Sequence, residues 1–159
     1  GLVTLITIII GFIAWQEART LGQAIEDLGY VRLPSVEALL IISEAQTAVD
    51  AAENALLAKN IDAQGRKNAY DRFDAAKKRA DNAWKIYEPL PQTKEEAAEW
   101  RAFVLAWNKW WEDHSTYVIL VKEYERNPSE ELYNKMSKQA LEINEVSFKA
   151  AVDSLNKVV

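Results

Sequence analysis

The single histidine of the chain, His114, is the residue whose chemistry is most versatile, because imidazole changes its charge near neutral pH. Trp107 and Val121 lie seven residues to either side, so all three are expected on one inner helix face. No Ser-His-Asp arrangement can be argued, because no nucleophile is identifiable around this histidine. Two interpretations stay open: a hydrogen-bonded core histidine, or a group that donates a hydrogen bond to a ligand carboxylate.

Arginines on the second predicted helix could bind an anion. Arg66, Arg72 and Arg79 recur along this helix, and Tyr70 lies beside the first two. The guanidinium fork matches a carboxylate in bidentate geometry, which makes a small organic acid a plausible ligand between helices. The alternative is a solvated face with intrahelical pairs, such as Asp62 with Arg66.

Tryptophans are concentrated in the third predicted helix. Trp100, Trp107, Trp110 and Trp111 lie within twelve residues, and Trp84 belongs to the helix before them. Such a cluster indicates either core packing or an aromatic-walled pocket between helices, where bundles often bind ligands. We do not expect both Trp107 and Trp110 to point to the bundle axis, so one should face solvent or a partner chain.

Composition excludes many other functions. The chain of 159 residues is long enough for about one domain and carries a net charge of −5, which argues against nucleic-acid binding. It has no cysteine and one histidine, which excludes thiolate and multi-histidine metal sites. No glycine-rich phosphate loop is present. We therefore expect no cofactor, no metal and no enzymatic activity.

Helix signals are frequent and strand signals are almost absent. We expect helix N-caps at Asn60, Thr93 and Asn127, with Thr93 beginning a capping box. Pro34 interrupts the first helix, and we expect a kink there. The connections are short, which predicts an all-α, up-down-up-down antiparallel four-helix bundle with an extended first helix. The predicted helices cover residues 2–58, 61–87, 94–126 and 128–158.

The helical period predicts which side chains face the bundle core. On the first helix the expected inward stripe is rich in alanine, which lets a neighbouring helix approach closely. Ala45, Ala48, Ala52 and Ala55 could contact the fourth helix of the same chain or the first helix of a second copy in a homodimer. The expected inward residues are Ala38, Ile41, Ile42, Ala45, Ala48, Val49, Ala52, Ala55 and Leu56 on the first helix, Ala69, Phe73, Ala76, Ala80, Ala83 and Tyr87 on the second, Trp100, Val104, Trp107, Trp111, His114, Val118 and Val121 on the third, and Leu132, Met136, Ala140, Ile143, Val146 and Ala150 on the fourth.

Residues 1–15, GLVTLITIIIGFIAW, carry no charged side chain. A membrane-spanning helix needs about 20 apolar residues, so we interpret this run as the outer end of a first transmembrane helix. Trp15 would then lie at the headgroup level, and residues 16–159 would form the ligand-binding bundle outside the membrane. The alternative is a buried core helix of a soluble protein.

The layout resembles a known family. An uncharged start, a long first helix with the motif Tyr-Val-Arg-Leu-Pro-Ser-Val at residues 30–36, and a bundle of four helices are similar to the extracytoplasmic sensor domain of methyl-accepting chemotaxis receptors. The resemblance implies a periplasmic domain of a bacterial inner-membrane receptor. It also implies a parallel homodimer through the first helices, a small ligand in the upper half and displacement of the fourth helix.

The ligand site is expected to depart from the family pattern. In aspartate-type members, arginines on the first helix bind the ligand across the dimer, but here no Arg or Lys occurs between Ser35 and Lys59. We therefore expect a pocket within one subunit. Its predicted residues are Arg66, Tyr70, Trp107, His114 and Tyr133.

Two alternative functions use the same fold. Similar input domains occur in membrane-bound histidine kinases and diguanylate cyclases. A structural bundle is the other possibility, in which exposed tryptophans of the third helix dock a partner protein and no small ligand is bound.

Overall fold

The computed structural model has only helices and connecting turns in the described part of the chain. It describes the backbone of residues 1–158 and the side chains of that range other than 2–10 and 24. Two segments, named η, are π-helical turns. In chain order the elements are α1 (Leu2–Asp27), η1 (Leu28–Arg32), α2 (Leu33–Leu56), α3 (Ala63–Tyr87), α4 (Lys94–Arg126), α5 (Glu130–Lys138), η2 (Gln139–Asn144) and α6 (Glu145–Leu155).

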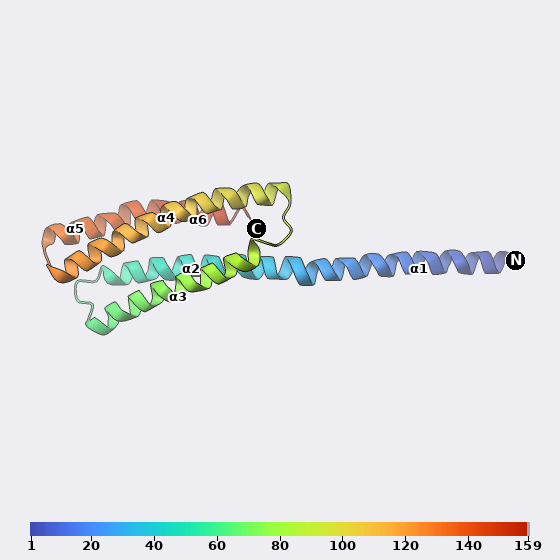
Figure 1. The fold of residues 1–159 in the computed structure, drawn as a ribbon, viewed down its shortest axis with the longest axis horizontal. Coiled ribbons are helices and arrows are strands. Elements are labelled where there is room, and N and C mark those ends of the chain that lie inside the picture. Colours follow the sequence, from blue (N-terminus) through green and yellow to red (C-terminus); the bar gives the residue numbers. More distant parts are fainter. Residues whose placement is uncertain (159) are drawn as a thin grey trace.

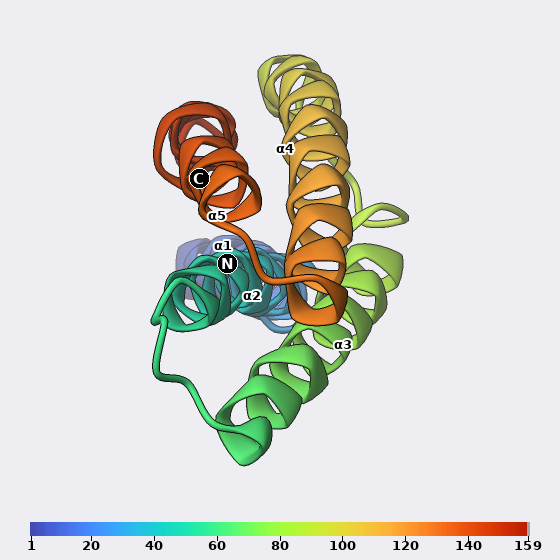
Figure 2. The same ribbon diagram turned by 90° about the vertical axis from the view of Figure 1, so that its left-hand side faces the viewer.

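The predicted four-helix bundle is confirmed. α1, η1 and α2 form one continuous first helix, and α5, η2 and α6 form the fourth (Figure 1). Within the bundle α2 packs mainly against α3, and α4 packs mainly against α6 (Figure 2). α1 projects beyond the bundle, at the end where the chain also finishes (Figure 1). The α2–α3 and α4–α5 connections lie at the opposite end of the bundle (Figure 1).

Pro34 does not produce the expected kink. α1 and α2 continue along nearly one line in Figure 1, and the turn before the proline is widened into η1. Leu33 donates its N–H to the carbonyl of Leu28, five residues back. Pro34 lies in the first turn of α2, where a missing N–H costs little. The π turn therefore accommodates the proline without bending the helix.

One predicted N-cap is confirmed and two are wrong. Thr93 and Glu96 form the expected capping box at the start of α4. The cap of α3 is Asp62, not Asn60, and its carboxylate accepts from the N–H of Gly65 at 2.7 Å. A carboxylate at this position also interacts with the positive end of the helix dipole. Ser129 caps α5, because Asn127 instead ends α4.

The core combines small buried side chains on α3 with large aromatic ones on α4. All six residues predicted to face inward on α3 are buried, and four of them are alanines. On α4 the buried face is wider than predicted, because this helix packs against α6 and also faces α3. Phe103, Trp110 and Tyr117 are buried, whereas Val104, Trp111 and Val118 are half-buried. Trp107 and Trp110 are both buried, so the expectation that one faces outward is wrong.

The fourth helix departs from its predicted face after Ala140. Ile143 and Val146 were expected in the core but are 40% and 68% exposed, and Ala150 is exposed as well. η2 contains one residue more than a regular helical turn, which shifts the inward positions that follow by one. The buried residues there are Asn144, Ser147, Ala151, Leu155 and Val158.

The alanines proposed for a dimer seam have different environments. Ala45 and Ala52 are buried within the chain, at 1% and 0% exposure, so a seam through them is wrong. Their helix, α2, packs mainly against α3 rather than against the fourth helix. Ala48 is half-buried, and Ala55 is exposed rather than inward.

α1 stands apart from the bundle. Phe12, Ile13 and Trp15 are at least half exposed, so the alternative of a buried core helix is wrong for this part of the run. The predicted membrane segment falls mainly on residues 2–10, whose side chains are outside the described part of the structure. No helix within the described residues is both long and apolar enough to cross a membrane.

The close approach of α2 and α3 makes a testable prediction. Ala76 is fully buried and Ala75, next to it, is exposed. Ala76→Leu should lower the free energy of unfolding by about 1–3 kcal/mol, because added methylenes have no room. Ala75→Leu should change it by less than about 0.5 kcal/mol. Urea unfolding monitored by circular dichroism measures both, and equal effects would contradict this account of the interface.

Candidate ligand-binding groove and its buried polar core

Glu53 is the most buried charged side chain of the described residues, with 3% exposure on α2. Nδ1 of His114 lies 2.6 Å from its Oε1, and Nδ2 of Asn144 lies 2.9 Å from each of its two oxygens. An ionised carboxylate only accepts hydrogen bonds, so this set of donors suits it and assigns the proton to Nδ1 of His114. The interaction joins α2, α4 and the π turn η2 in one buried network.

Gln139 closes this network. Its Nε2 donates to Oδ1 of Asn144 at 2.9 Å and to the backbone carbonyl of Asp113 at 3.3 Å. Gln139 and Asn144 are five residues apart, and a π turn, whose hydrogen bonds link i and i+5, places them on the same face. The polar core therefore depends on the irregular geometry of the fourth helix.

Tyr117 supports the backbone of the same region. Its hydroxyl donates to the carbonyl of Glu53 at 2.8 Å, and its side chain is fully buried. Burial, followed by the nearby Glu53 carboxylate, raises the pKa of Tyr117. The hydroxyl consequently remains a proton donor at physiological pH and fixes α4 against α2.

A groove of about 320 Å³ lies between α3 and α4, directly beside this polar core. Its size is near the lower limit of small-molecule sites. A second hollow of about 360 Å³ adjoins it and shares Lys77. The groove is lined by Tyr70, Phe73, Asp74, Lys77, Trp111, His114, Val118 and Lys122, and the second hollow by Lys77, Asp81, Trp84, Lys85, Trp107 and Asn108.

Aromatic rings form the wall of the groove. The His114 ring is 4.6 Å from that of Phe73, edge to face, and 4.8 Å from that of Trp111. Two lysines lie over the rings: Nζ of Lys77 is 5.5 Å from the Trp111 ring, and Nζ of Lys122 is 5.8 Å from the Tyr70 ring. This arrangement combines flat apolar surface with positive charge.

The charged groups of the groove differ in how they are paired. Lys77 forms an ion pair with Asp81, one turn along α3. Among the described residues, Lys122 and Asp74 have no ion-pair partner. Lys122 is therefore the cation of the groove that is available to an incoming anion.

The structure does not bring the five predicted site residues together. Tyr70 and His114 line the groove, and Trp107 lines the neighbouring hollow. Tyr133 lies on α5 and donates its hydroxyl to the Leu57 carbonyl at 3.1 Å. Arg66 is outside the groove lining as well.

Arg66 is bound to an acidic residue of the chain itself. Its Nη1 lies 3.2 Å from Oε1 of Glu125, and the hydroxyl of Tyr70 donates to the same oxygen at 3.2 Å. Burial, followed by Glu125, raises the pKa of Tyr70, which keeps the phenol as the donor. Arg66 thus holds Glu125, and Glu125 holds Tyr70 at the edge of the groove.

The sequence reasoning missed Glu53, Asn144 and Gln139, which complete the polar core. One signal was present for Glu53, which falls on the apolar stripe between Val49 and Leu56. A carboxylate on such a stripe needs a buried donor, and the chain has one histidine to supply it. Asn144 had no such signal, because its position depends on the π turn.

Comparison with protein-family models matches residues 1–158 to the four helix bundle sensory module for signal transduction. The chain belongs to this family. The resemblance seen in the sequence is thereby confirmed for the family. Comparison with curated proteins and with solved structures gave no match for the sensory module.

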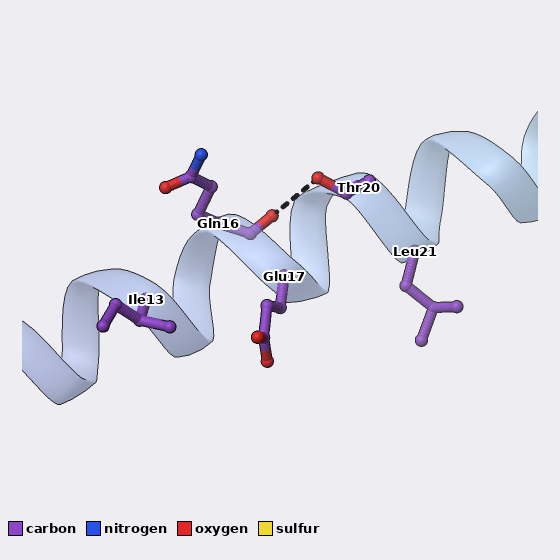
Figure 3. A pocket seen from close by; sticks show the side chains of 5 residues that line it. All are labelled: Ile13, Gln16, Glu17, Thr20 and Leu21. Atoms are coloured by element: carbon purple, nitrogen blue, oxygen red, sulfur yellow. Dashed lines mark hydrogen bonds between the residues drawn. The ribbon is translucent and has the colours of Figure 1, made fainter.

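A further hollow of the sensory module lies on α1 alone. Its lining residues, Ile13, Gln16, Glu17, Thr20 and Leu21, all come from this one helix, and Thr20 donates to the carbonyl of Gln16 (Figure 3). Within the described part of the chain no residue of a second element lines the hollow, so it has one wall. It cannot enclose a ligand within a single chain.

The tryptophans of α4 lie in the core or beside it and form no exposed docking patch. Trp100, Trp107 and Trp110 are all at most 6% exposed, and Trp111 is half-buried at the groove. A partner protein would therefore find little tryptophan surface on α4. The alternative of a bundle that docks a partner through exposed tryptophans loses the feature on which it rested.

Asp50 lies one turn before Glu53 and makes a pH-dependent prediction. Burial, followed by the charges of Glu53 and Glu145, raises its pKa, against the hydrogen bond from Asn54 at 3.2 Å. Because the pKa is higher in the folded state, ionised Asp50 lowers stability at neutral pH. This cost disappears as the pH falls through the raised value.

We expect Asp50→Asn to increase the free energy of unfolding at pH 7, with the difference from the wild type vanishing below about pH 4, near the unfolded carboxyl pKa. Urea unfolding at both pH values measures this. Glu44→Gln, at an exposed position of the same helix, is the control and should have little effect. A stabilisation by Asp50→Asn that is equal at both pH values would contradict the electrostatic cause.

Proposed function

We propose that this sensory module is the extracytoplasmic sensor domain of a bacterial membrane receptor of the chemotaxis type, and that it binds a small organic acid in the α3–α4 groove. The observation that carries the proposal is the position of His114. Its ring lines the groove while its Nδ1 is bonded to Glu53 on α2. An acid in the groove would therefore act directly on the buried core of the bundle.

Charge and shape together favour a flat carboxylate. The ammonium group of Lys122, which lines the groove, has no ion-pair partner among the described residues. The rings of Phe73 and Trp111 offer flat apolar surface between them. A planar acid would satisfy the cation and cover the rings, whereas a strongly hydrated dicarboxylate would leave the rings exposed.

The module needs no chemical step for this function. Binding energy would shift the equilibrium between two packings of the helices, by no more than the difference in affinity of the acid for the two states. The fourth helix is the natural output, because it ends beside the point where α1 leaves the bundle (Figure 1). In this proposal α1 leads to the membrane, and the bundle lies in the periplasm.

Isothermal titration with a matched panel tests the ligand site. We expect benzoate to bind more tightly than cyclohexanecarboxylate, which is not planar, and than benzamide, which has no charge. Lys122→Gln and Trp111→Leu should each weaken benzoate binding at least about tenfold, the size expected when a charged or aromatic contact of about 1.4 kcal/mol is lost. Lys149→Gln, an exposed lysine of α6, is the control. Unchanged binding in both groove variants would overturn the site.

We also propose that a second copy of the chain packs along the first helix. Six large apolar side chains form a continuous stripe along the first helix, and each of them is more than half exposed. An exposed apolar stripe of this length is unusual unless another surface covers it. Their spacing is 4, 3, 5, 3 and 4 residues, and the step of five spans η1. The residues are Leu21, Ile25, Leu28, Leu33, Val36 and Leu40.

The π turn explains the irregular step. A seam between two helices repeats every seven residues, in steps of three and four. One extra residue would move the stripe off the seam in a regular helix. Because η1 accommodates that residue, the apolar stripes of α1 and α2 remain in line. This continuity favours a second identical helix as the partner.

The dimer is tested by sedimentation of the detergent-solubilised chain. Leu33→Glu and Leu40→Glu should each raise the dissociation constant at least about tenfold, because a charge would be buried in the seam. Leu105→Glu introduces the same charge at an exposed site of α4 and should leave association unchanged. Equal effects of all three variants would contradict a seam on the first helix.

A further inference from the structure

His114 is the one groove-lining side chain, among the described residues, that makes a hydrogen bond to the first helix. The other hydrogen-bonding groups of the groove stay within α3 and α4: Tyr70 donates to Glu125, and Lys77 donates to Asp81. The groove and the buried core therefore communicate through one imidazole ring. A group in the groove that shifts this ring would also shift Nδ1 relative to Glu53.

We infer that His114, Glu53 and Asn144 form a relay that passes occupancy of the groove to the π turn η2 of the fourth helix. What occupies the groove rests on the proposed function above. The relay itself rests on contacts already present in the chain, and it can be tested without a ligand.

Glu53 is the centre of the relay, because its buried carboxylate is bonded to both of the other members. It is 3% exposed, and its side-chain donors are His114 and Asn144. A buried carboxylate that loses a donor is strongly destabilising. Any displacement of the His114 ring toward the groove must therefore be matched by movement of the Asn144 amide.

Asn144 transmits this movement to the backbone of the fourth helix. Its Oδ1 accepts from Gln139 at 2.9 Å across η2. In a regular α-helix, residues five apart lie about 140° apart around the axis, so this bond favours the π turn over the α form. Loss of the bond releases the turn toward α geometry.

The output of this release is a movement of α6. Conversion of a π turn to α geometry removes one residue of register, which corresponds to about 100° of rotation and about 1.5 Å of rise. A partial conversion of η2 toward α geometry would rotate α6 relative to α5 by part of this angle. Ile143, which is 40% exposed beside Asn144, is then available to take the inward position.

Hydrogen–deuterium exchange of the full chain tests the relay. His114→Phe removes the donor to Glu53 and keeps a ring of similar shape. Amides of residues 139–148 should exchange at least tenfold faster in this variant, relative to amides of residues 73–83 in α3. Asp74→Asn changes an exposed groove residue that contacts neither Glu53 nor the His114 ring, and it should leave this ratio unchanged. An unchanged ratio in His114→Phe would overturn the relay.

Removal of one residue from η2 gives a second test, which applies even where His114→Phe unfolds. Deletion of the exposed Glu142 should convert the fourth helix to a regular helix while keeping Asn144, Ala151 and Leu155 inward. In this background His114→Phe, together with Glu53→Gln to remove the unpaired charge, should no longer accelerate exchange at residues 139–148. Acceleration equal to that of the same double substitution without the deletion would overturn the role of the π turn.

The two proposals fail in different ways. If benzoate and the other acids do not bind, the exchange experiments still report whether the relay exists. If the exchange ratio is unchanged in His114→Phe, acid binding that depends on Lys122 still stands.

Discussion

A carboxylate that is almost completely buried constrains three helices of this bundle at once. Glu53 must receive hydrogen bonds from protein, and the donors come from two other helices: His114 on α4 and Asn144 on the fourth helix. The requirement couples the positions of three helices, α2, α4 and the fourth helix. It also favours the π turn that presents Asn144, so one charge accounts for an irregular element across the bundle.

The sequence predicted the architecture well because the fold depends on regular features. The capping box at Thr93, the proline-rich turn before α4 and the alanine face of α3 all act locally or with the period of a regular helix. The groove residues Tyr70 and His114 were found for the same reason, since each lies at a recognisable position on its helix. The residues that were missed in the fourth helix, Gln139 and Asn144, are brought together by a departure from that period, the π turn η2.

The fourth helix illustrates the limit of that reasoning. A regular period predicts Ile143 in the core, and apolarity supports the prediction, yet Asn144 occupies the position. The extra residue of η2 reverses which of two neighbours faces inward, and the Glu53 carboxylate that Asn144 then reaches lies on another helix. Arg66, predicted as a pocket residue, lies outside the groove for a different reason. Its guanidinium group suits an anion, but Glu125 of α4 already supplies one. Partners that are distant in sequence decided both cases.

The alanine interface between α2 and α3 has a mechanical consequence. Methyl side chains have no rotamers, so the tightly joined α2–α3 pair cannot repack by exchanging side-chain conformations. The other half of the bundle contains long and aromatic side chains, such as Met136 and Trp110, and a helix with a built-in irregularity. The molecule is thus stiff on one side and compliant on the other: α2–α3 serves as a fixed frame against which the remaining helices can be displaced.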